Sequence, residues 1–383
     1  MHDMSIRILI IPFLAIMVMI SSCNHSLENN ASNNKINVGV FNGNGASAVC
    51  VLETLEALKI DSGICPISIS ASEIMNGALD NLDVIIFPGG SGSKEYNNLG
   101  IMAADKVKAF TAQENKGIVG ICAGGYLLAS TPNYASLQML PVHSIRSYYN
   151  RGRGLISFSL TEEGVNIFPE LTKMKESFLQ YYDGPMYENI DSTRFTTIAT
   201  VVTDIVTKRG FPEGVSIGKP AVGIANYGNG RIIMTTGHPE STSGMRWMVP
   251  RMARWAANKP MISYSDLVVR PKKYSKELLF YPDDISDEKD YFWKLSSDNE
   301  EEIIQALDSL YALNSRPSIR WSIGLLRHNS PVIRSKAAEY LLETEYTWAV
   351  PEVESSYNNE LDTETKNKLN VVLFNLKKMV HQN

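Results

Sequence analysis

Cys122 lies in the segment Gly120-Ile121-Cys122-Ala123-Gly124-Gly125, between the apolar run 117–119 and the helix-like run 126–129. A strand that turns sharply into a helix exposes the residue at the turn, and the turn is so tight that its neighbours must be small. Glycines on both sides of Cys122 meet this requirement. A thiol at the first turn of a helix also faces unpaired N–H groups, whose partial positive charge favours the nucleophilic thiolate. The segment predicts covalent thiol chemistry, although a small buried cysteine in an ordinary strand-to-helix junction has the same pattern.

A glycine-rich loop, Pro88-Gly89-Gly90-Ser91-Gly92, follows the buried-strand pattern of residues 83–87. Because glycine has no side chain, such a loop lets the backbone approach a ligand closely. Gly89 and Gly90 can therefore aim N–H groups at a developing oxyanion, and the N–H of Ala123 is the expected second donor. Pro-Gly-Gly is also a common strand-ending turn, so the loop alone does not predict a site.

His238 and Glu240 follow the second strand of a predicted hairpin. Two apolar runs, 221–225 and 231–236, flank a segment with Asn-Gly, which is a strong hairpin signal. The imidazole of His238 can act as general base towards Cys122, and the carboxylate of Glu240 can hold the ring in one tautomer. A solvated loop histidine is the alternative for His238, and His143 is a rival base with the same alternative. The order of glycine loop, cysteine elbow and strand-end His-Pro-Glu favours a Cys-His-Glu triad.

That order resembles the class I glutamine amidotransferase fold over roughly residues 36–258. Within this superfamily the chain looks most like the domain found at the N-terminus of eukaryotic biotin-protein ligases and in stand-alone bacterial proteins. The motifs that carry the likeness are Val40–Ser47, Phe-Pro-Gly-Gly, Gly-Ile-Cys-Ala-Gly-Gly-Tyr and Tyr181–Pro185. The resemblance implies that Cys122 is the nucleophile, His238 the base and Glu240 the orienting carboxylate. It also implies that Gly89, Gly90 and Ala123 form the oxyanion site.

The chain departs from the family pattern at Tyr126. Glutamine-using amidotransferases usually carry a glutamine four residues after the cysteine, and this position holds Tyr126 instead. No synthetase domain and no biotin ligase catalytic domain is recognisable in the rest of the sequence. The resemblance therefore implies the fold and the triad, but it does not imply glutamine as the substrate. Arg151-Gly152-Arg153-Gly154 is interpreted as a basic surface loop.

A substrate pocket is expected beside the triad. Its candidate residues lie after the first strand, in the elbow helix, and between the elbow and His238. They are Asn42, Gly43, Tyr126, Arg146, Tyr182 and Asp183.

Alternating strand and helix patterns predict an α/β fold with a mostly parallel sheet and helices on both faces. The predicted strands are 36–41, 66–69, 84–87 and 118–121, and the predicted helices are 48–58, 101–113 and 245–257. Cys122 and the glycine loop both follow predicted strands, so they are expected at the carboxyl edge of the sheet.

Composition excludes some classes of function. The 383 residues carry a net charge of −5, with both signs interspersed and no dense Lys or Arg block, so no nucleic-acid partner is predicted. No spacing of cysteines and histidines indicates a zinc site, and no cofactor is predicted. For Cys50 and Cys65 the sequence is consistent with either a disulfide or two unpaired thiols.

The N-terminus predicts export and lipidation. The apolar run 8–20 is too short to cross the roughly 30 Å hydrocarbon core of a bilayer, so it is interpreted as part of a signal peptide. Ser21-Ser22-Cys23 resembles a bacterial lipobox, which makes residues 1–23 a lipoprotein signal peptide and Cys23 the lipidation site. Residues 24–35 are expected to be a flexible tether. The resulting protein is held on a bacterial cell envelope, and a cleaved soluble protein is the alternative.

After the main domain (36–258), residues 259–290 are expected to be a linker and residues 291–383 a helical module. The segment 329–342 has a cap, a first-turn proline and apolar residues at helical spacing. It resembles a HEAT-type repeat, with neighbours at 319–326 and 369–376. Such a module either docks another protein or packs against the main domain.

Together these features predict an envelope-anchored thiol-dependent hydrolase or amidase that acts on a small-molecule or peptide-like amide or ester. The alternative is a non-catalytic binding or scaffold lipoprotein that uses the same pocket and docks proteins through its helical tail.

Overall fold

The computed structural model describes residues 35–148, 152–173, 176–204, 212–271, 282–313, 315 and 318–380. The predicted signal peptide, Cys23 and the tether up to residue 34 lie outside these residues. Among the helices that are described, none combines the length and the apolarity needed to cross a bilayer.

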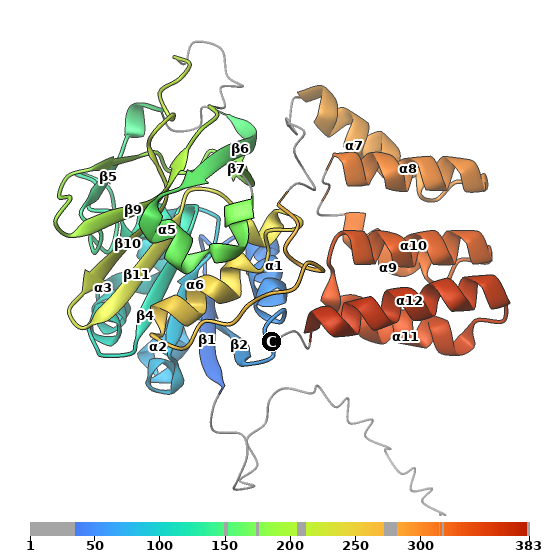
Figure 1. Ribbon diagram of the computed structural model, residues 1–383, viewed down its shortest axis with the longest axis horizontal. Coiled ribbons are helices and arrows are strands. Elements are labelled where there is room, and N and C mark those ends of the chain that lie inside the picture. The colour runs from blue at the N-terminus through green and yellow to red at the C-terminus, as the bar shows by residue number, and fades with distance from the viewer. Residues whose placement is uncertain are drawn as a thin grey trace, which may run out of the picture. The chain divides into compact units, whose positions relative to one another are not determined.

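A nine-stranded sheet with the order β2-β1-β3-β4-β11-β10-β9-β6-β7 organises the main domain (Figure 1). The first five strands in this order are parallel to one another, and each later strand pairs antiparallel with its neighbour. The parallel strands are β1 (Ile36–Phe41), β2 (Ile64–Ile69), β3 (Val84–Phe87), β4 (Gly117–Ile121) and β11 (Gly230–Thr235). The antiparallel strands are β6 (Arg153–Leu160), β7 (Ser177–Tyr182), β9 (Phe195–Val201) and β10 (Pro220–Tyr227). A separate antiparallel pair joins β5 (Val142–Ser144) to β8 (Tyr187–Asn189).

Two hydrophobic cores lie on the two faces of the sheet. Successive side chains of a strand point to opposite faces, so Val84 and Ile86 of β3 enter one core and Ile85 and Phe87 enter the other. The first core contains side chains of α1 (Ala48–Leu58) and α6 (Met248–Ala256), and the second those of α2 (Ala71–Met75), α3 (Gly92–Thr111) and α4 (Ala123–Leu128). Helices therefore cover both faces of the sheet, and the predicted fold class is confirmed.

The first strand and the first helix have the predicted bounds, whereas α3 begins well before the predicted start. Gly100 lies inside α3 with φ 67° and ψ 169°, which interrupts the helical backbone. The apolar periodicity is continuous only after this glycine, so the pattern predicted the second half of the helix alone. The first half carries Ser91 at its start and the buried residues Glu95 and Leu99.

Six α-helices are described after residue 281. They are α7 (Pro282–Lys294), α8 (Glu300–Ala312), α9 (Ser318–Leu325), α10 (Pro331–Glu343), α11 (Val350–Asn359) and α12 (Thr363–Val380). The segment with the predicted cap forms α10, where the hydroxyl of Ser330 accepts a hydrogen bond from the N–H of Ile333 at 3.4 Å. The helix α7 begins inside the stretch that was expected to be an irregular linker. We call residues 282–380 the helical module.

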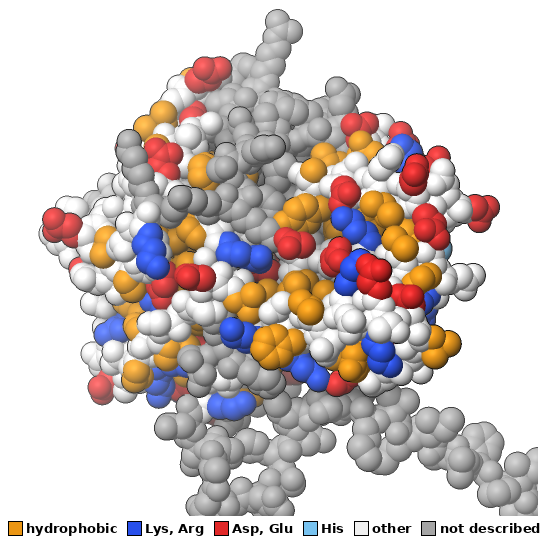
Figure 2. Space-filling view, turned by 45° about the vertical axis from the view of Figure 1, so that its right-hand side comes forward, with side chains coloured by type: hydrophobic (Ala, Val, Ile, Leu, Met, Phe, Trp, Pro, Cys, Tyr) orange, Lys and Arg blue, Asp and Glu red, His pale blue; other side chains and the backbone are white. Residues whose placement is uncertain are grey.

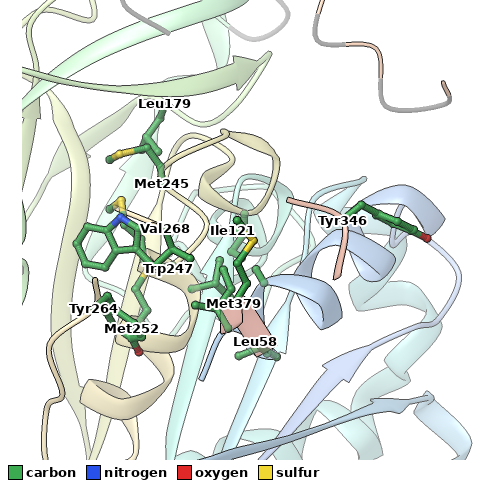
Figure 3. Packing of buried hydrophobic residues seen from close by; sticks show 14 of the residues in the cluster. Leu58, Ile121, Leu179, Met245, Trp247, Met252, Tyr264, Val268, Tyr346 and Met379 are labelled. Carbon is green, nitrogen blue, oxygen red and sulfur yellow. The ribbon is translucent and has the colours of Figure 1, made fainter. Parts of the chain in front are cut away.

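The helical module and the main domain share one hydrophobic core. Figure 3 shows part of this cluster, which contains Leu58 of α1, Met252 of α6 and Met379 of α12. Trp247 and Tyr264 belong to the same cluster, with ring centroids 5.7 Å apart. Of the two roles expected for the module, packing against the main domain is observed, and docking of another protein stays a prediction.

The surface carries charges of both signs. On the face that Figure 2 shows, Lys and Arg side chains alternate with Asp and Glu, and hydrophobic side chains lie between them. This distribution agrees with the mixed charge of the sequence.

Candidate active site

The order of the parallel strands brings the predicted site residues to one edge of the sheet. The strands β3, β4 and β11 are neighbours, and their carboxyl ends lead directly into the glycine loop, Cys122 and His238. Ligand sites of open α/β sheets lie at this edge, outside the carboxyl ends of the strands.

Cys122 occupies a sharp turn between β4 and α4. Its backbone has φ 50° and ψ −100°, a conformation that side-chain-bearing residues rarely adopt and that is typical of strained functional positions. Its N–H donates to the carbonyl of Thr235 at 3.0 Å, which ties the turn to β11. The turn also needs glycine, because a Cβ at Gly124 would lie 2.1 Å from the carbonyl oxygen of Phe87. The sequence pattern of the elbow thus has a steric cause.

His238 and Glu240 form a buried pair. Nδ1 of His238 lies 2.7 Å from Oε1 of Glu240, and the two residues are 3% and 0% exposed. The short helical turn η4 (Pro239–Ser241) places the carboxylate beside the ring of the residue before it. The N–H of His238 donates to the carbonyl of Gln180 at 2.8 Å, and the ring edge meets Tyr182 with centroids 5.5 Å apart. The imidazole is therefore held on two sides.

The charge of the imidazole depends on both of its neighbours. Burial alone would lower the pKa of His238, but the negative charges of Cys122 and Glu240 outweigh it and hold the pKa well above its ordinary value. Because Nδ1 is engaged by Glu240, Nε2 is the ring atom that can exchange a proton with Cys122. In the described part of the chain, Nε2 has no hydrogen-bond partner.

Gly90 and Ala123 provide backbone N–H groups beside the thiol. Gly90 has φ 153° and forms an antiparallel bridge with Ala46. The two hydrogen bonds of this bridge come from the N–H groups of Ser47 and Ser91, each at 2.8 Å from its acceptor, so the N–H of Gly90 takes no part in them. Both Gly90 and Ala123 line the pocket that Cys122 faces. They can therefore act as the donors of an oxyanion site.

The pocket has a volume of about 530 Å³. It combines aromatic side chains, hydroxyl groups and a few charged groups, as small-molecule sites do. Its lining residues are Ser47, Cys50, Gly90, Ser91, Gly92, Ser93, Cys122, Ala123, Tyr126, Tyr134, Ser144, Arg146, Arg153, Tyr182, Asp183 and His238.

Most residues predicted for the site lie together here. Tyr126, Arg146, Tyr182 and Asp183 line the pocket with Cys122, Ala123, Gly90 and His238. Gly89 lies behind the imidazole, where an added Cβ would be 2.5 Å from Cε1 of His238.

Five described residues named from the sequence do not line this pocket: Asn42, Gly43, Gly89, His143 and Glu240. The side chain of Asn42 donates to the hydroxyl of Ser68 at 3.1 Å, and a Cβ at Gly43 would lie 2.1 Å from the side chain of Asn98. The loop after β1 therefore points Asn42 and Gly43 away and presents the first turn of α1 to the pocket instead.

Sequence reasoning missed Cys50 and Arg153. Cys50 lies in the first turn of α1, and its Sγ is 4.0 Å from Nδ1 of His238. Arg153 is half exposed, as expected of a surface loop, but it also lines the pocket and pairs with Asp183 at 3.1 Å. The signal that could have found Cys50 is its place three residues after Ser47, at the start of a helix that follows a parallel strand.

Cys50 bears on the questions of a disulfide and of a metal. Within the described residues, Cys50 and Cys65 form no disulfide with each other. Cys50, His238 and Glu240 place ligand atoms within 4.8 Å of one another, a set of sulfur, nitrogen and oxygen donors that suits zinc. A metal there would replace the hydrogen bond between Nδ1 and the carboxylate, so it would compete with the triad geometry.

The loop that carries the triad rests on the helical module. The N–H of Gly244 donates to the carboxylate of Glu345 at 2.9 Å. Nη1 of Arg246 donates to the carbonyls of Thr344 and Glu345 at 2.9 and 3.0 Å. The turn after α10 therefore supports the segment that follows His238 and Glu240.

A family model described as "Biotin-protein ligase, N terminal" matches residues 36–264. This match covers more than half of the 383 residues and contains every residue of the pocket. No curated protein matches the chain.

Several solved structures are similar to part of the chain. A structure described as a glutamine amidotransferase is 18% identical, with a TM-score of 0.41 and coverage of 58% of this chain and 98% of that chain. The CTPS glutaminase domain of Trypanosoma brucei with bound acivicin is 14% identical, with a TM-score of 0.41 and coverage of 60% and 96%. A carbohydrate deacetylase, Agd3, is 11% identical, with a TM-score of 0.40 and coverage of 57% and 32%.

Proposed function

The chain belongs to the family of biotin-protein ligase N-terminal domains, and from this premise we propose that it is a thiol-dependent hydrolase or amidase with a Cys-His-Glu triad. One observation supports the proposal above the others. The buried pair of His238 and Glu240, with 2.7 Å between Nδ1 and Oε1, lies beside a strained cysteine that opens onto a pocket.

In the proposed reaction, Nε2 of His238 takes the proton of the Cys122 thiol, and Sγ attacks the carbonyl carbon of an amide or ester. The N–H groups of Gly90 and Ala123 stabilise the oxyanion. The carbon–heteroatom bond breaks, the leaving amine or alcohol takes the proton from His238, and an acyl-thioester remains on Cys122. Water then gives a proton to His238 and attacks the thioester, which releases the carboxylic acid and restores the thiol.

Glutamine is not the substrate that we propose. Tyr126 stands where glutamine-using enzymes carry a glutamine, and its hydroxyl donates to the carbonyl of Gly184 at 3.0 Å. The phenol therefore closes one side of the pocket. The substrate is a different small-molecule or peptide-like amide or ester.

We also propose that the protein works on a bacterial cell envelope, held to the membrane by lipid on Cys23. The support comes from the sequence alone, through the apolar run 8–20 and the small residues before Cys23. Radiolabelled palmitate that enters the wild-type protein but not the Cys23→Ala variant would support this anchoring.

Site-specific alkylation tests the catalytic proposal. The full chain is treated with iodoacetamide between pH 5 and 9, and the modification of Cys122 is followed by peptide mass spectrometry. We expect Cys122 to react faster than the exposed-thiol reference glutathione at pH 6, and His238→Ala to abolish this excess. A rate at pH 6 that is the same in both proteins would contradict the triad. Cys65, which does not line the pocket, is the internal control for general reactivity.

One contact favours a second function, a binding protein without turnover. Sγ of Cys122 lies 3.7 Å from the carbonyl oxygen of Tyr182, which can accept a hydrogen bond from the thiol in place of the imidazole. A slow, His238-independent alkylation of Cys122 is the result that this function predicts.

A further inference from the structure

Among the described residues that line the pocket, one positive side chain forms no ion pair with an acid. Arg153 and Asp183 form an ion pair with Nε and Oδ2 3.1 Å apart, so their charges largely cancel. Arg146 also lines the pocket, and within the described ranges it forms no ion pair with an acidic residue. Arg146 therefore gives the described part of the pocket lining an excess of positive charge.

Tyr134 holds the guanidinium of Arg146 in place. The centre of the guanidinium lies 4.9 Å from the centroid of the Tyr134 ring. The ring is itself fixed, because its hydroxyl accepts a hydrogen bond from the N–H of Ser93 at 2.9 Å and its centroid lies 6.0 Å from that of Tyr126. A guanidinium stacked on an aromatic face keeps the N–H groups on its edges available for a planar acceptor.

The net charge of the whole chain has the opposite sign to this local charge, and the contrast bears on the class of substrate. The protein has a net charge of −5, so its general field repels anions. An anionic substrate therefore gains more than a neutral one from a positive side chain in the pocket. A bidentate pair with a carboxylate is the contact that arginine forms best.

We propose that the substrate is an amide or ester that also carries a carboxylate, and that Arg146 binds this carboxylate while the reacting carbonyl lies at Cys122. This inference rests on the proposed function and adds the class of substrate to it. Arg146 is then a specificity-determining residue, and Tyr134 is the platform that positions it.

Two matched sets of thiol probes test the proposal. N-(ω-carboxyalkyl)maleimides carry a carboxylate on chains of increasing length, and N-(ω-hydroxyalkyl)maleimides are their neutral counterparts. Alkylation of Cys122 in the full chain is measured by peptide mass spectrometry, which also separates it from Cys50. At low ionic strength we expect one chain length of the anionic set to react about five- to tenfold faster than its neutral partner. The preference should decline as salt is added.

Arg146→Gln should reduce the ratio of anionic to neutral rates to about one. Arg231→Gln is the matched control, because it removes the same charge from a residue that does not line the pocket. Thermal unfolding of both variants shows that they are folded.

The outcomes separate this inference from the proposed function. If Cys122 reacts in a His238-dependent way with both sets at equal rates, or if the preference persists in Arg146→Gln, the carboxylate proposal is wrong and the thiol chemistry stands. If Cys122 reacts with neither set, the proposed function fails and the substrate class fails with it.

Discussion

Glu56 of α1 accepts two hydrogen bonds from Thr347, one from the backbone N–H at 2.9 Å and one from the hydroxyl at 2.7 Å. Both residues are buried, and Glu56 lies 4.0 Å from the guanidinium of Arg246. Burial raises the pKa of Glu56 from 4.5 to about 7, although Arg246 and Thr347 lower it in part. The contact between the main domain and the helical module therefore contains a carboxyl that is half protonated near neutral pH.

This carboxyl predicts how stability depends on pH. Its pKa is higher in the folded state, so between pH 4.5 and about 7 the folded protein binds more protons than the unfolded chain. The contribution of Glu56 is therefore greatest at or below pH 4.5 and declines, by about 3 kcal/mol in total, as the pH rises to 7. Glu56→Gln should remove this decline and be more stable than the wild type above pH 7. Urea unfolding at intervals from pH 5 to 8 measures the free energy of unfolding of both proteins.

The control is Glu354→Gln, which removes a half-exposed carboxylate that pairs with Lys377 on the surface. It should change stability by less than about 1 kcal/mol and leave the pH dependence as it is. Parallel stability curves for Glu56→Gln and the wild type would contradict the assignment.

Glu240→Gln should weaken the imidazole as a proton acceptor. The negative charge of Glu240 contributes to the raised pKa of His238, so its loss lowers that pKa. Fewer molecules then hold a charged imidazole beside a thiolate at pH 6, and we expect the alkylation of Cys122 to slow by at least about tenfold there. The measurement is the rate of alkylation against pH.

Glu188→Gln is the matched control for this variant, because Glu188 faces the other histidine of the region, His143, across β5 and β8. Its pH profile should equal that of the wild type. Should Glu240→Gln also retain the wild-type profile, Glu240 has no part in setting the charge of His238.

Some of these features were predictable from local sequence. The elbow requires glycine two residues before and two residues after Cys122, so the local sequence predicts its geometry. The strand β1 and the helix α1 are bounded by polar or glycine-containing segments, and their predicted limits were correct. The hairpin of β10 and β11 follows from its Asn-Gly turn.

Other features depend on contacts between distant residues. Arg246 and Glu345 are 99 positions apart, and no local pattern links them. Cys50 lines the pocket beside His238, which is 188 positions away along the chain. The strands β6, β7 and β9 were missed because their polar and apolar residues do not alternate regularly, as SFLQYY in β7 and FTTIATV in β9 show, and because their antiparallel partners lie far away along the chain.

The steric requirement at the elbow predicts opposite effects of the same substitution at two glycines. Gly124→Ala would place a Cβ 2.1 Å from the carbonyl oxygen of Phe87, so the elbow must shift. We expect a loss of at least about 3 kcal/mol and a loss of Cys122 alkylation. Gly324→Ala, at an exposed position of α9 where the added Cβ would meet no atom outside its own helix turn within 4 Å, should stabilise by about 0.5–1 kcal/mol. Chemical unfolding measures the free energy of unfolding of both variants, and equal changes in the two would contradict this steric explanation.

The support of the catalytic loop by the helical module predicts that Arg246 affects the active site from a distance. Arg246→Met leaves the buried carbonyls of Thr344 and Glu345 without their donor, which should destabilise by about 2–4 kcal/mol. Because the same residues hold the loop after Glu240, amide hydrogen exchange in 239–246 should rise and Cys122 alkylation should slow under conditions where the protein stays folded.

Arg334→Met is the comparison, since Arg334 pairs with Glu360 inside the helical module, with Nη2 2.7 Å from Oε1. This variant should lose stability while the exchange of 239–246 and the reactivity of Cys122 stay at wild-type values. If Arg334→Met slows the alkylation of Cys122 as much as Arg246→Met does, then general destabilisation explains the effect and the helical module does not position the triad through this turn.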